Sequence, residues 1–336
     1  MKAYALTSYK NEGTMQWVDR EVPQPGPRQV QVRVQAAGLN PLDRMIAGGQ
    51  FKGLLSYRLP QVMGQEFAGV ITQVGPGVSR YSVGDAVFGR PAIGRIGTFA
   101  EYLVADAADI APAPKGLAPE EAASLPLVLL TAIQAFTEKA RVKPGDKVFI
   151  QGGSGGLGSV AVQVAKHLGA TVATTVSTPN VEVARRLGAD VVVDYRTQRY
   201  EDHVRDYDVV LDTLGGEETV RSMGVLRRGG SMVSVVGAPD ADFARELGKP
   251  LLIPVMWALG AKVWREAGKR GIGYRFLFMR ASGQQLADAT PAIESGEISP
   301  LVGSVLPFAR LEEALETSAA GKGGPGKIVV TMDGAS

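Results

Sequence analysis

The chain has 336 residues, of which 45% are hydrophobic and 21% charged, a composition typical of soluble globular proteins rather than disordered or membrane-embedded ones. Its formal net charge of +2 is nearly balanced, and no segment has the dense basic face of a nucleic-acid-binding protein. We therefore expect two domains of ordinary size and no nucleic-acid partner.

Targeting and membrane signals are not visible in the sequence. Met1–Tyr9 (MKAYALTSY) lacks the apolar core of roughly 7–15 residues that a secretory signal carries. No apolar run approaches the roughly 20 residues that span a bilayer. We expect no integral membrane segment and, as the default, a cytoplasmic enzyme.

Residues that commonly bind zinc are scarce. The chain has no cysteine, which excludes disulfides, and only two histidines. His167 falls late in an expected helix, and His203 lies in a polar stretch. Catalytic zinc takes three protein ligands and structural zinc four, usually including Cys or His. We interpret both histidines as surface residues and expect no metal site.

The first 120 residues have the character of an all-β region. Gln29–Ala36 (QVQVRVQA) alternates polar and apolar side chains with period two, as a half-buried strand does. Val70–Val74 and Asp85–Phe88 are further expected strands, separated by glycine-containing turns. Pro119–Ala140 is then expected to be helical, because Glu120 and Glu121 favour the first turn of a helix.

From Lys147 onward, short apolar runs alternate with helical stretches. Such alternation predicts βαβ units and a parallel sheet. A last strand, Lys327–Thr331, is expected to rejoin the N-terminal domain. The expected strands between are Val148–Gln151, Thr171–Val176, Val191–Asp194, Val209–Asp212 and Ser231–Val236, and the clearest helices are Ser159–Leu168 and Asn180–Leu187.

The strongest motif is Gly152–Gly158 (GGSGGLG), which stands directly between an expected strand and an expected helix. Gly153, Gly155 and Gly158 satisfy the pattern G-x-G-x-x-G. These glycines allow a tight turn, a close approach to pyrophosphate and the packing of helix on strand. The strand–turn–helix–strand context predicts a dinucleotide site rather than a glycine-rich loop without a ligand. Ser154, Gly156 and Leu157 belong to the same site.

The end of the second strand of this region indicates which dinucleotide binds. An NAD site usually has Asp or Glu there, bonded to the ribose 2′-hydroxyl. Thr174–Asn180 (TTVSTPN) has no carboxylate, which favours NADPH. Arg196 has the alternative reading of an ordinary surface charge. The expected contacts to the 2′-phosphate are Ser177, Thr178 and Asn180, with Tyr195 and Arg196 after the third strand, and Val236 and Gly237 complete the cofactor set.

Several motifs, taken in order, resemble one enzyme family. The chain resembles the zinc-independent members of the medium-chain dehydrogenase/reductase superfamily, in the quinone oxidoreductase and enone (alkenal) reductase branch. In zinc-dependent relatives a metal-binding His stands where this chain has Gln65. The motifs are Gly38–Asp43 (GLNPLD), Gly64–Val70 (GQEFAGV), Val83–Gly89 (VGDAVFG), Leu125–Ala132 (LPLVLLTA) and the glycine turn.

The resemblance implies a fold and an assembly. The fold is α/β, with a doubly wound parallel-sheet Rossmann domain at residues 123–274 inserted into a mostly-β, GroES-like substrate domain formed by residues 1–122 and 275–336. The active site is expected in the cleft between these domains. A homodimer is expected through the edge of the Rossmann sheet, near Ser231–Val236.

The resemblance also implies catalytic positions. Asn40, Asp43 and Thr131 are expected near the nicotinamide or the cleft floor, and Phe276 is expected to line the pocket. Asn40 also suits a turn, and Asp43 equally suits an ion pair that holds its loop. Relatives often carry Tyr or Lys where this chain has Met45, so no convincing general acid remains. We expect a proton from solvent, with Asn40 or a backbone N–H donating to the developing oxyanion.

The predicted function is NADPH-dependent hydride transfer to quinones or to the C=C bond of α,β-unsaturated carbonyls. The alternative is a non-catalytic NADPH-binding redox sensor or interaction protein on the same fold. The segment Leu251–Arg280 combines Trp257, Trp264 and Tyr274 with many basic residues. It has three readings: an amphipathic helical connection with a basic face, a lid over the substrate, and a contact to an acidic substrate portion or a membrane surface.

Overall fold

Residues 1–10, 13–55 and 57–332 are described by the computed structural model, and the chain divides into two units. The first unit is Met1–Leu130 together with Arg280–Ser336, and the second is Thr131–Met279. The boundaries expected from the sequence, after residues 122 and 274, fall a few residues before these divisions. None of the helices in the described ranges is long and apolar enough to cross a membrane.

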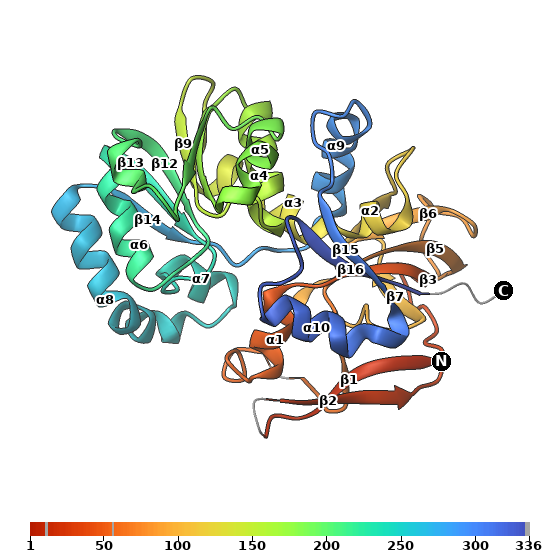
Figure 1. The fold of residues 1–336 in the computed structure, drawn as a ribbon. Coiled ribbons are helices and arrows are strands. Elements are labelled where there is room, and N and C mark those ends of the chain that lie inside the picture. The colour runs from red at the N-terminus through yellow and green to blue at the C-terminus, as the bar shows by residue number, and fades with distance from the viewer. Residues whose placement is uncertain (11–12, 56, 333–336) are drawn as a thin grey trace. The chain divides into compact units, whose positions relative to one another are not determined.

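The second unit contains a doubly wound parallel sheet (Figure 1). Its strands lie in the order β11-β10-β9-β12-β13-β14, so the chain moves outward in both directions from the first strand, β9. This order is that of a Rossmann fold, and the expected α/β class is confirmed. The strands are β9 (Lys147–Ile150), β10 (Thr171–Val176), β11 (Val191–Asp194), β12 (Tyr207–Asp212), β13 (Leu226–Ser234) and β14 (Gly273–Phe276).

Two expectations about these elements were wrong. The edge of the sheet is β14, and the strand that covers Ser231–Val236 in part, β13, is an interior strand. Strand β14 (GYRF) escaped prediction because it is short and contains Gly and Arg, which break the apolar run expected of a buried strand. Pro119–Ala140 is not one helix, since Pro126 begins a new helix where its missing N–H costs nothing.

Helices flank the sheet of the second unit. The end of α3 (Pro126–Ile133) leads into a π-helical turn, Gln134–Lys139, before β9 begins. The helices that follow in chain order are α4 (Gly156–His167), α5 (Val181–Arg186), α6 (Glu217–Ser222), α7 (Ala241–Glu246) and α8 (Ile253–Arg270).

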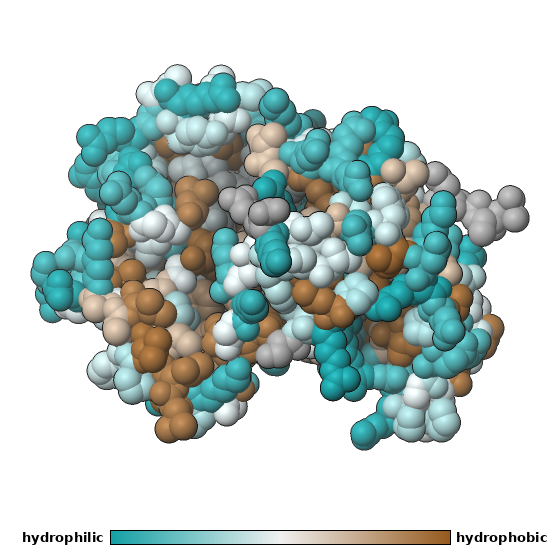
Figure 2. Space-filling model, turned by 90° about the horizontal axis from the view of Figure 1, so that it is seen from below, coloured by the Kyte–Doolittle hydropathy of each residue, from teal (hydrophilic) through white to brown (hydrophobic). Residues whose placement is uncertain are grey.

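Helix α8 buries one face and exposes apolar residues on the other. Met256, Gly260 and Ala267 recur at helical spacing and are buried. Large apolar side chains just before and within its first turns stay exposed. Hydrophobic residues gather at the lower left of Figure 2, on the side where Figure 1 shows α7 and α8.

The first unit is mostly β and is built from both ends of the chain. Its seven-stranded sheet has the order β15-β16-β3-β5-β6-β8, with β7 also paired to β3, and a smaller sheet has the order β2-β1-β4. The last strand pairs antiparallel with β3, so the expected return of Lys327–Thr331 to the N-terminal domain is confirmed. The strands are β1 (Lys2–Ser8), β2 (Thr14–Asp19), β3 (Gln29–Gly38), β4 (Gln61–Val62), β5 (Glu66–Val74), β6 (Ala86–Gly89), β7 (Tyr102–Asp106), β8 (Ile110–Pro112), β15 (Val302–Pro307) and β16 (Lys327–Thr331).

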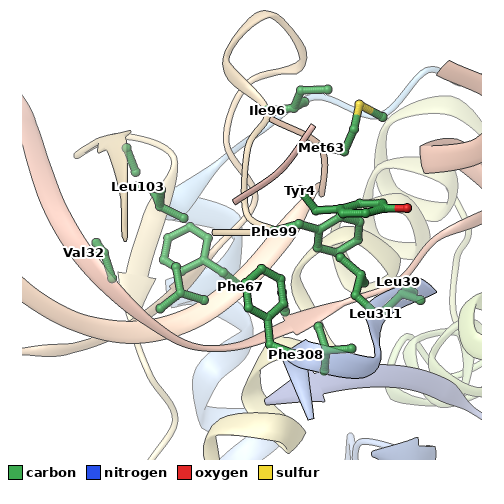
Figure 3. Packing of buried hydrophobic residues seen from close by; sticks show 14 of the residues in the cluster. Tyr4, Val32, Leu39, Met63, Phe67, Ile96, Phe99, Leu103, Phe308 and Leu311 are labelled. Atoms are coloured by element: carbon green, nitrogen blue, oxygen red, sulfur yellow. The ribbon is translucent and has the colours of Figure 1, made fainter. Parts of the chain in front are cut away.

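The core of the first unit joins these two chain segments. Figure 3 shows Tyr4, Phe67 and Phe99 grouped with Phe308 and Leu311 from the C-terminal segment. Burial of such large side chains stabilises the unit by about 1.5–3 kcal/mol each. The helices of this unit are α1 (Pro41–Ala47), α2 (Pro119–Ala123), the start of α3, α9 (Gly283–Glu294) and α10 (Leu311–Ala319).

Candidate functional site

The glycine turn of the second unit lies between β9 and α4 and leaves no room for side chains at two positions. A Cβ atom on Gly153 would stand 2.2 Å from the Thr174 hydroxyl oxygen, and one on Gly158 would stand 2.1 Å from the carbonyl oxygen of Gly152. Gly155 is the N-cap of α4, whose first N–H groups and positive dipole end suit an anion. The turn therefore fits the pyrophosphate of a dinucleotide.

Two of the expected phosphate contacts, Ser177 and Asn180, lie together just after β10, beside Ser154 of the glycine turn. The side-chain amide of Asn180 donates hydrogen bonds to the hydroxyl oxygens of Ser154 (3.1 Å) and Ser177 (3.2 Å). The cluster joins the glycine turn to the loop where an NAD site usually has its carboxylate. Hydroxyl and amide groups can donate to phosphate oxygens, so the cluster suits a 2′-phosphate.

A carboxylate that the sequence analysis missed stands at the end of the neighbouring strand, β11. Asp194 accepts hydrogen bonds from the Thr178 hydroxyl and from the backbone N–H of Arg196 (3.0 Å). The bond from Thr178 is the main reason that the pKa of Asp194 is held below its ordinary value. Thr178 is therefore engaged by an anion, while Tyr195 and Arg196 are exposed.

A second missed carboxylate organises the loops at the ends of β12 and β13. Asp212 is fully buried and accepts hydrogen bonds from the Gly215 N–H (2.9 Å), the Thr219 hydroxyl (2.6 Å) and the Ser234 hydroxyl (2.8 Å). The Ser234 oxygen in turn accepts the N–H of Gly237 (2.8 Å). The expected cofactor position at residues 236–237 is thus held by a chain of hydrogen bonds that ends on Asp212.

The other two expected positions of this unit are buried. Thr131 is 5% exposed and lies in α3, just before the π-helical turn, a feature frequent at functional sites. Phe276 is 6% exposed, and its ring packs edge-on against Phe243 with 5.1 Å between centroids. The cofactor contact of Phe276 stays a prediction.

In the first unit, a buried lysine is bound by three oxygen atoms. The ammonium group of Lys327, at the start of β16, donates to the Leu39 carbonyl (2.8 Å) and to Asn40 Oδ1 (2.5 Å). It also forms an ion pair with Glu66 Oε1 at 2.6 Å. Lys327 is 5% exposed and Glu66 is fully buried, so the two charges balance each other away from solvent.

Asn40 lies at the centre of this cluster and is fixed in one orientation. Its side-chain amide donates to Glu66 Oε1 (2.8 Å) while its oxygen accepts from Lys327. Its backbone N–H donates to Asp43 Oδ2 (2.8 Å) at the start of α1. The expected site residues Asn40 and Asp43 are therefore brought together. Glu66 and Lys327 complete the group.

Asp43 is an unusual carboxyl group because it is fully buried. Burial raises its pKa to about 7, against the opposing effects of the Asn40 backbone N–H and the Lys327 charge. The carboxyl group is therefore near its titration midpoint at neutral pH.

Gln65 faces a second buried cation. The guanidinium group of Arg90 is 1% exposed and donates to Gln65 Oε1 at 3.3 Å. Burial lowers the pKa of Arg90 to about 10, so it remains charged at neutral pH. No group of three or more His, Cys, Asp or Glu side chains that could hold a metal is present in the described part of the chain. Both His167 and His203 are exposed.

Comparison with known proteins places the chain in a family. The model of the alcohol dehydrogenase GroES-like domain matches residues 26–115, and that of the zinc-binding dehydrogenase domain matches residues 187–330. The 2-methylene-furan-3-one reductase of Solanum lycopersicum is 33% identical, covering 98% of this chain and 79% of its own. The chain belongs to the medium-chain dehydrogenase/reductase family, in its quinone oxidoreductase and enone reductase branch.

Two further members of the medium-chain family agree with this placement. The chloroplastic NADPH-dependent alkenal/one oxidoreductase of Arabidopsis thaliana is 32% identical over 98% of this chain and 79% of its own. The solved structure of the quinone oxidoreductase from Coxiella burnetii has a TM-score of 0.84 at 27% identity and covers 99% of both chains. The GroES-like and Rossmann organisation expected for a medium-chain reductase is thereby confirmed.

Five residues of this chain were missed as site residues: Glu66, Arg90, Asp194, Asp212 and Lys327. A weak signal existed for two of them. Glu66 opens the apolar run of β5, and Lys327 opens the apolar run of β16. A charged residue at the start of a buried strand needs a partner, but the sequence does not say which.

We expect the ion pair between Lys327 and Glu66 to be strongly coupled. Lys327→Met leaves Glu66 as an uncompensated buried charge, so the free energy of unfolding of the first unit falls by about 3–5 kcal/mol. Glu66→Gln also destabilises the unit. The double variant loses less than the sum of the two, by at least about 1 kcal/mol.

The measurement is urea unfolding in a Trp257→Phe, Trp264→Phe background. Trp17 then reports on the first unit alone, because it packs against Tyr4 (5.1 Å) and Phe308 (5.0 Å). Additive losses in the double variant would contradict a coupled pair.

The raised pKa of Asp43 predicts a pH dependence of stability. The folded protein ionises this carboxyl group less readily than the unfolded chain, whose pKa is near 3.8. The free energy of unfolding therefore falls as pH rises from about 4 to about 7, at most by about 1.4 kcal/mol per pH unit, and levels off above. Asp43→Asn flattens this slope, measured by the same Trp17 signal.

The matched control is Asp19→Asn, which removes an exposed carboxylate from the same unit. This variant should keep the wild-type slope. Equal slopes in wild type and Asp43→Asn would show that Asp43 titrates at its ordinary pKa.

Proposed function

We propose that this protein transfers a hydride from NADPH to a quinone or to the C=C bond of an α,β-unsaturated carbonyl compound, without zinc. The observation that carries the proposal is the glycine turn, where Gly153 and Gly158 exclude any side chain and α4 begins at the ligand position. Membership of the quinone oxidoreductase and enone reductase branch supports the substrate class.

The proposed cofactor is NADPH rather than NADH. The cluster of Ser154, Ser177 and Asn180 supports this choice, since its hydroxyl and amide groups can donate hydrogen bonds to a 2′-phosphate. The neighbouring carboxylate of Asp194 is engaged by Thr178 and by the Arg196 N–H. Arg196 would add positive charge, and Tyr195 an exposed ring. Because Thr178 already donates to Asp194, we assign it a supporting role and assign the phosphate contact to Ser177 and Asn180.

The positive charge of two buried side chains supports a reaction without zinc. Two buried cations, Arg90 and Lys327, lie beside the polar groups Gln65, Asn40 and Glu66. Like charges disfavour a divalent metal ion there. The chain also has no thiolate ligand to offer.

The chain's own residues would position the reactants and exclude water. NADPH supplies the hydride when bound. Residues 153–158 hold the pyrophosphate, and Val236, Gly237, Thr131 and Phe276 are proposed to lie along the nicotinamide half. Because the Asn40 amide already donates to Glu66, we propose that Asn40 positions its loop and that a backbone N–H donates to the developing oxyanion. The proton then comes from solvent.

The second candidate is a non-catalytic NADPH-binding sensor. The observation that favours it is the commitment of both Asn40 and Thr178 to internal partners, together with Met45 in a place where relatives carry Tyr or Lys. Both candidates bind NADPH, so turnover separates them.

We expect the protein to consume NADPH when it is mixed with simple quinones or enones. The loss of NADPH absorbance measures this consumption. Gly155→Ala should lower NADPH affinity by about tenfold or more without a loss of stability, because its Cβ meets only an ordinary contact at 3.4 Å. Gly224→Ala, with open space around its Cβ, is the matched control. Tight NADPH binding without turnover of any substrate would favour the sensor.

The assignment of NADPH predicts the effect of a negative charge at Ser177, in the loop directly after β10. Ser177→Asp should weaken NADPH binding by about tenfold or more, through repulsion of the 2′-phosphate, and leave NADH binding nearly unchanged. Fluorescence titration of the nicotinamide measures both affinities. Equal losses for the two cofactors would remove Ser177 from the phosphate site.

A further inference from the structure

The segment before and within the first half of α8 exposes large apolar side chains. Leu251 is 92% exposed, Trp257 64% and Leu259 67%, and Val255 is 51% exposed. Single exposed hydrophobic residues are ordinary, but these four lie within nine consecutive residues. Such a concentration on one short segment marks a surface that another body covers. We call Leu251, Val255, Trp257 and Leu259 the apolar tip.

The packing of the second unit makes no use of the apolar tip. The inward face of α8 is already complete, with Met256, Gly260 and Ala267 buried. Trp264 packs edge-on against Tyr274 of β14, with 5.0 Å between ring centroids. The apolar tip therefore has no packing role within its own unit, and its exposure needs another explanation.

The exposed side chains of α8 change from apolar in its first half to basic in its second half. Lys262 and Arg265 are exposed and follow Leu259 at helical spacing. The described carboxylates of α7 and α8 that form ion pairs do so with other residues. The pairs are Asp242 with Arg245, Glu246 with Lys139, and Glu266 with Lys269 and Arg270. Asp240 caps α7 through the Phe243 N–H. Among the residues that the structure describes, no carboxylate forms an ion pair with Lys262 or Arg265.

We propose that the apolar tip and these two cations dock on a lipid membrane with anionic headgroups. Tryptophan and aliphatic side chains beside lysine and arginine are the composition of helices that lie at a membrane surface. Lys262 is about 4.5 Å further along the helix axis than Leu259. With the N-terminal end of α8 directed into the membrane, Leu259 reaches the acyl boundary, while Lys262 and Arg265, further along the axis, meet the lipid phosphates.

A second copy of the chain is the less suitable occupant. A two-fold contact would place the same surface on both sides. The described carboxylates near that surface that form ion pairs do so with other residues, so they are not free for Lys262 and Arg265, whereas anionic lipids supply the complementary charge. The docking goes beyond the proposed function and does not depend on it, because binding to vesicles is measured without substrate.

The test is co-sedimentation of the full chain with vesicles of phosphatidylcholine alone or mixed with phosphatidylserine. We expect binding to the mixed vesicles, weakened by salt, with Trp257 fluorescence quenched by brominated lipid. Leu251→Ser, Trp257→Ser and Leu259→Ser together should lower the partition coefficient about tenfold or more. Lys262→Glu with Arg265→Glu should also lower it about tenfold or more.

The matched control is Val83→Ser with Val305→Ser, which changes exposed apolar residues (65% and 47%) of the first unit. It should bind vesicles like wild type, and an unchanged circular dichroism spectrum shows that each variant is folded. Absence of binding to the mixed vesicles overturns the proposal, as does unchanged binding of the apolar-tip variant. A dimer in solution that the same three substitutions dissociate, without vesicle binding, would assign the surface to self-association.

Discussion

The buried ion pair between Lys327 and Glu66 is the interaction on which the first unit depends. Two charges out of water are tolerated only when each is fully bonded, and here the surrounding groups satisfy that condition. The Lys327 ammonium group takes three oxygen acceptors, and Glu66 takes the amide of Asn40 and the backbone N–H of Leu127 (2.7 Å). The pair therefore fixes the end of β3, the start of β5 and the start of β16 at one point. Every position assigned to chemistry in this unit is held through that point.

Asp194 and Asp212 of the Rossmann unit show how the surroundings of an aspartate decide what it does. Asp212 is buried and uses its oxygens on hydrogen bonds that shape two loops. Asp194 lies at the end of β11, accepts a hydroxyl and a backbone N–H, and stays ionised beside the expected phosphate contacts. Both stand at the ends of apolar strands, so their different partners, not their positions in the chain, separate a carboxyl group that shapes loops from one that lies beside the proposed phosphate contacts.

The Rossmann unit was readable from the sequence because its determinants are local. Residues 152–158 contain the whole turn, and the runs at 171–176 and 191–194 match β10 and β11 in full. The polar cluster of the first unit was not readable, since its members come from residues 40, 66 and 327 and meet only when the sheet forms. Strand β14 was missed for a different reason: pairing along β13, rather than its own pattern, makes GYRF a strand.

The placement of Lys327 also bears on how the protein is made. Glu66 and Asp43 leave the ribosome long before their cation does, by on the order of ten seconds or more at ordinary rates of translation. During that interval the N-terminal strands hold buried-type carboxyl groups without a counter-charge, and β3 lacks its neighbour β16. The continuous segment 131–279 suffers no such delay. The second unit can thus fold first during synthesis, and the first unit folds completely only when the C-terminal segment has been made.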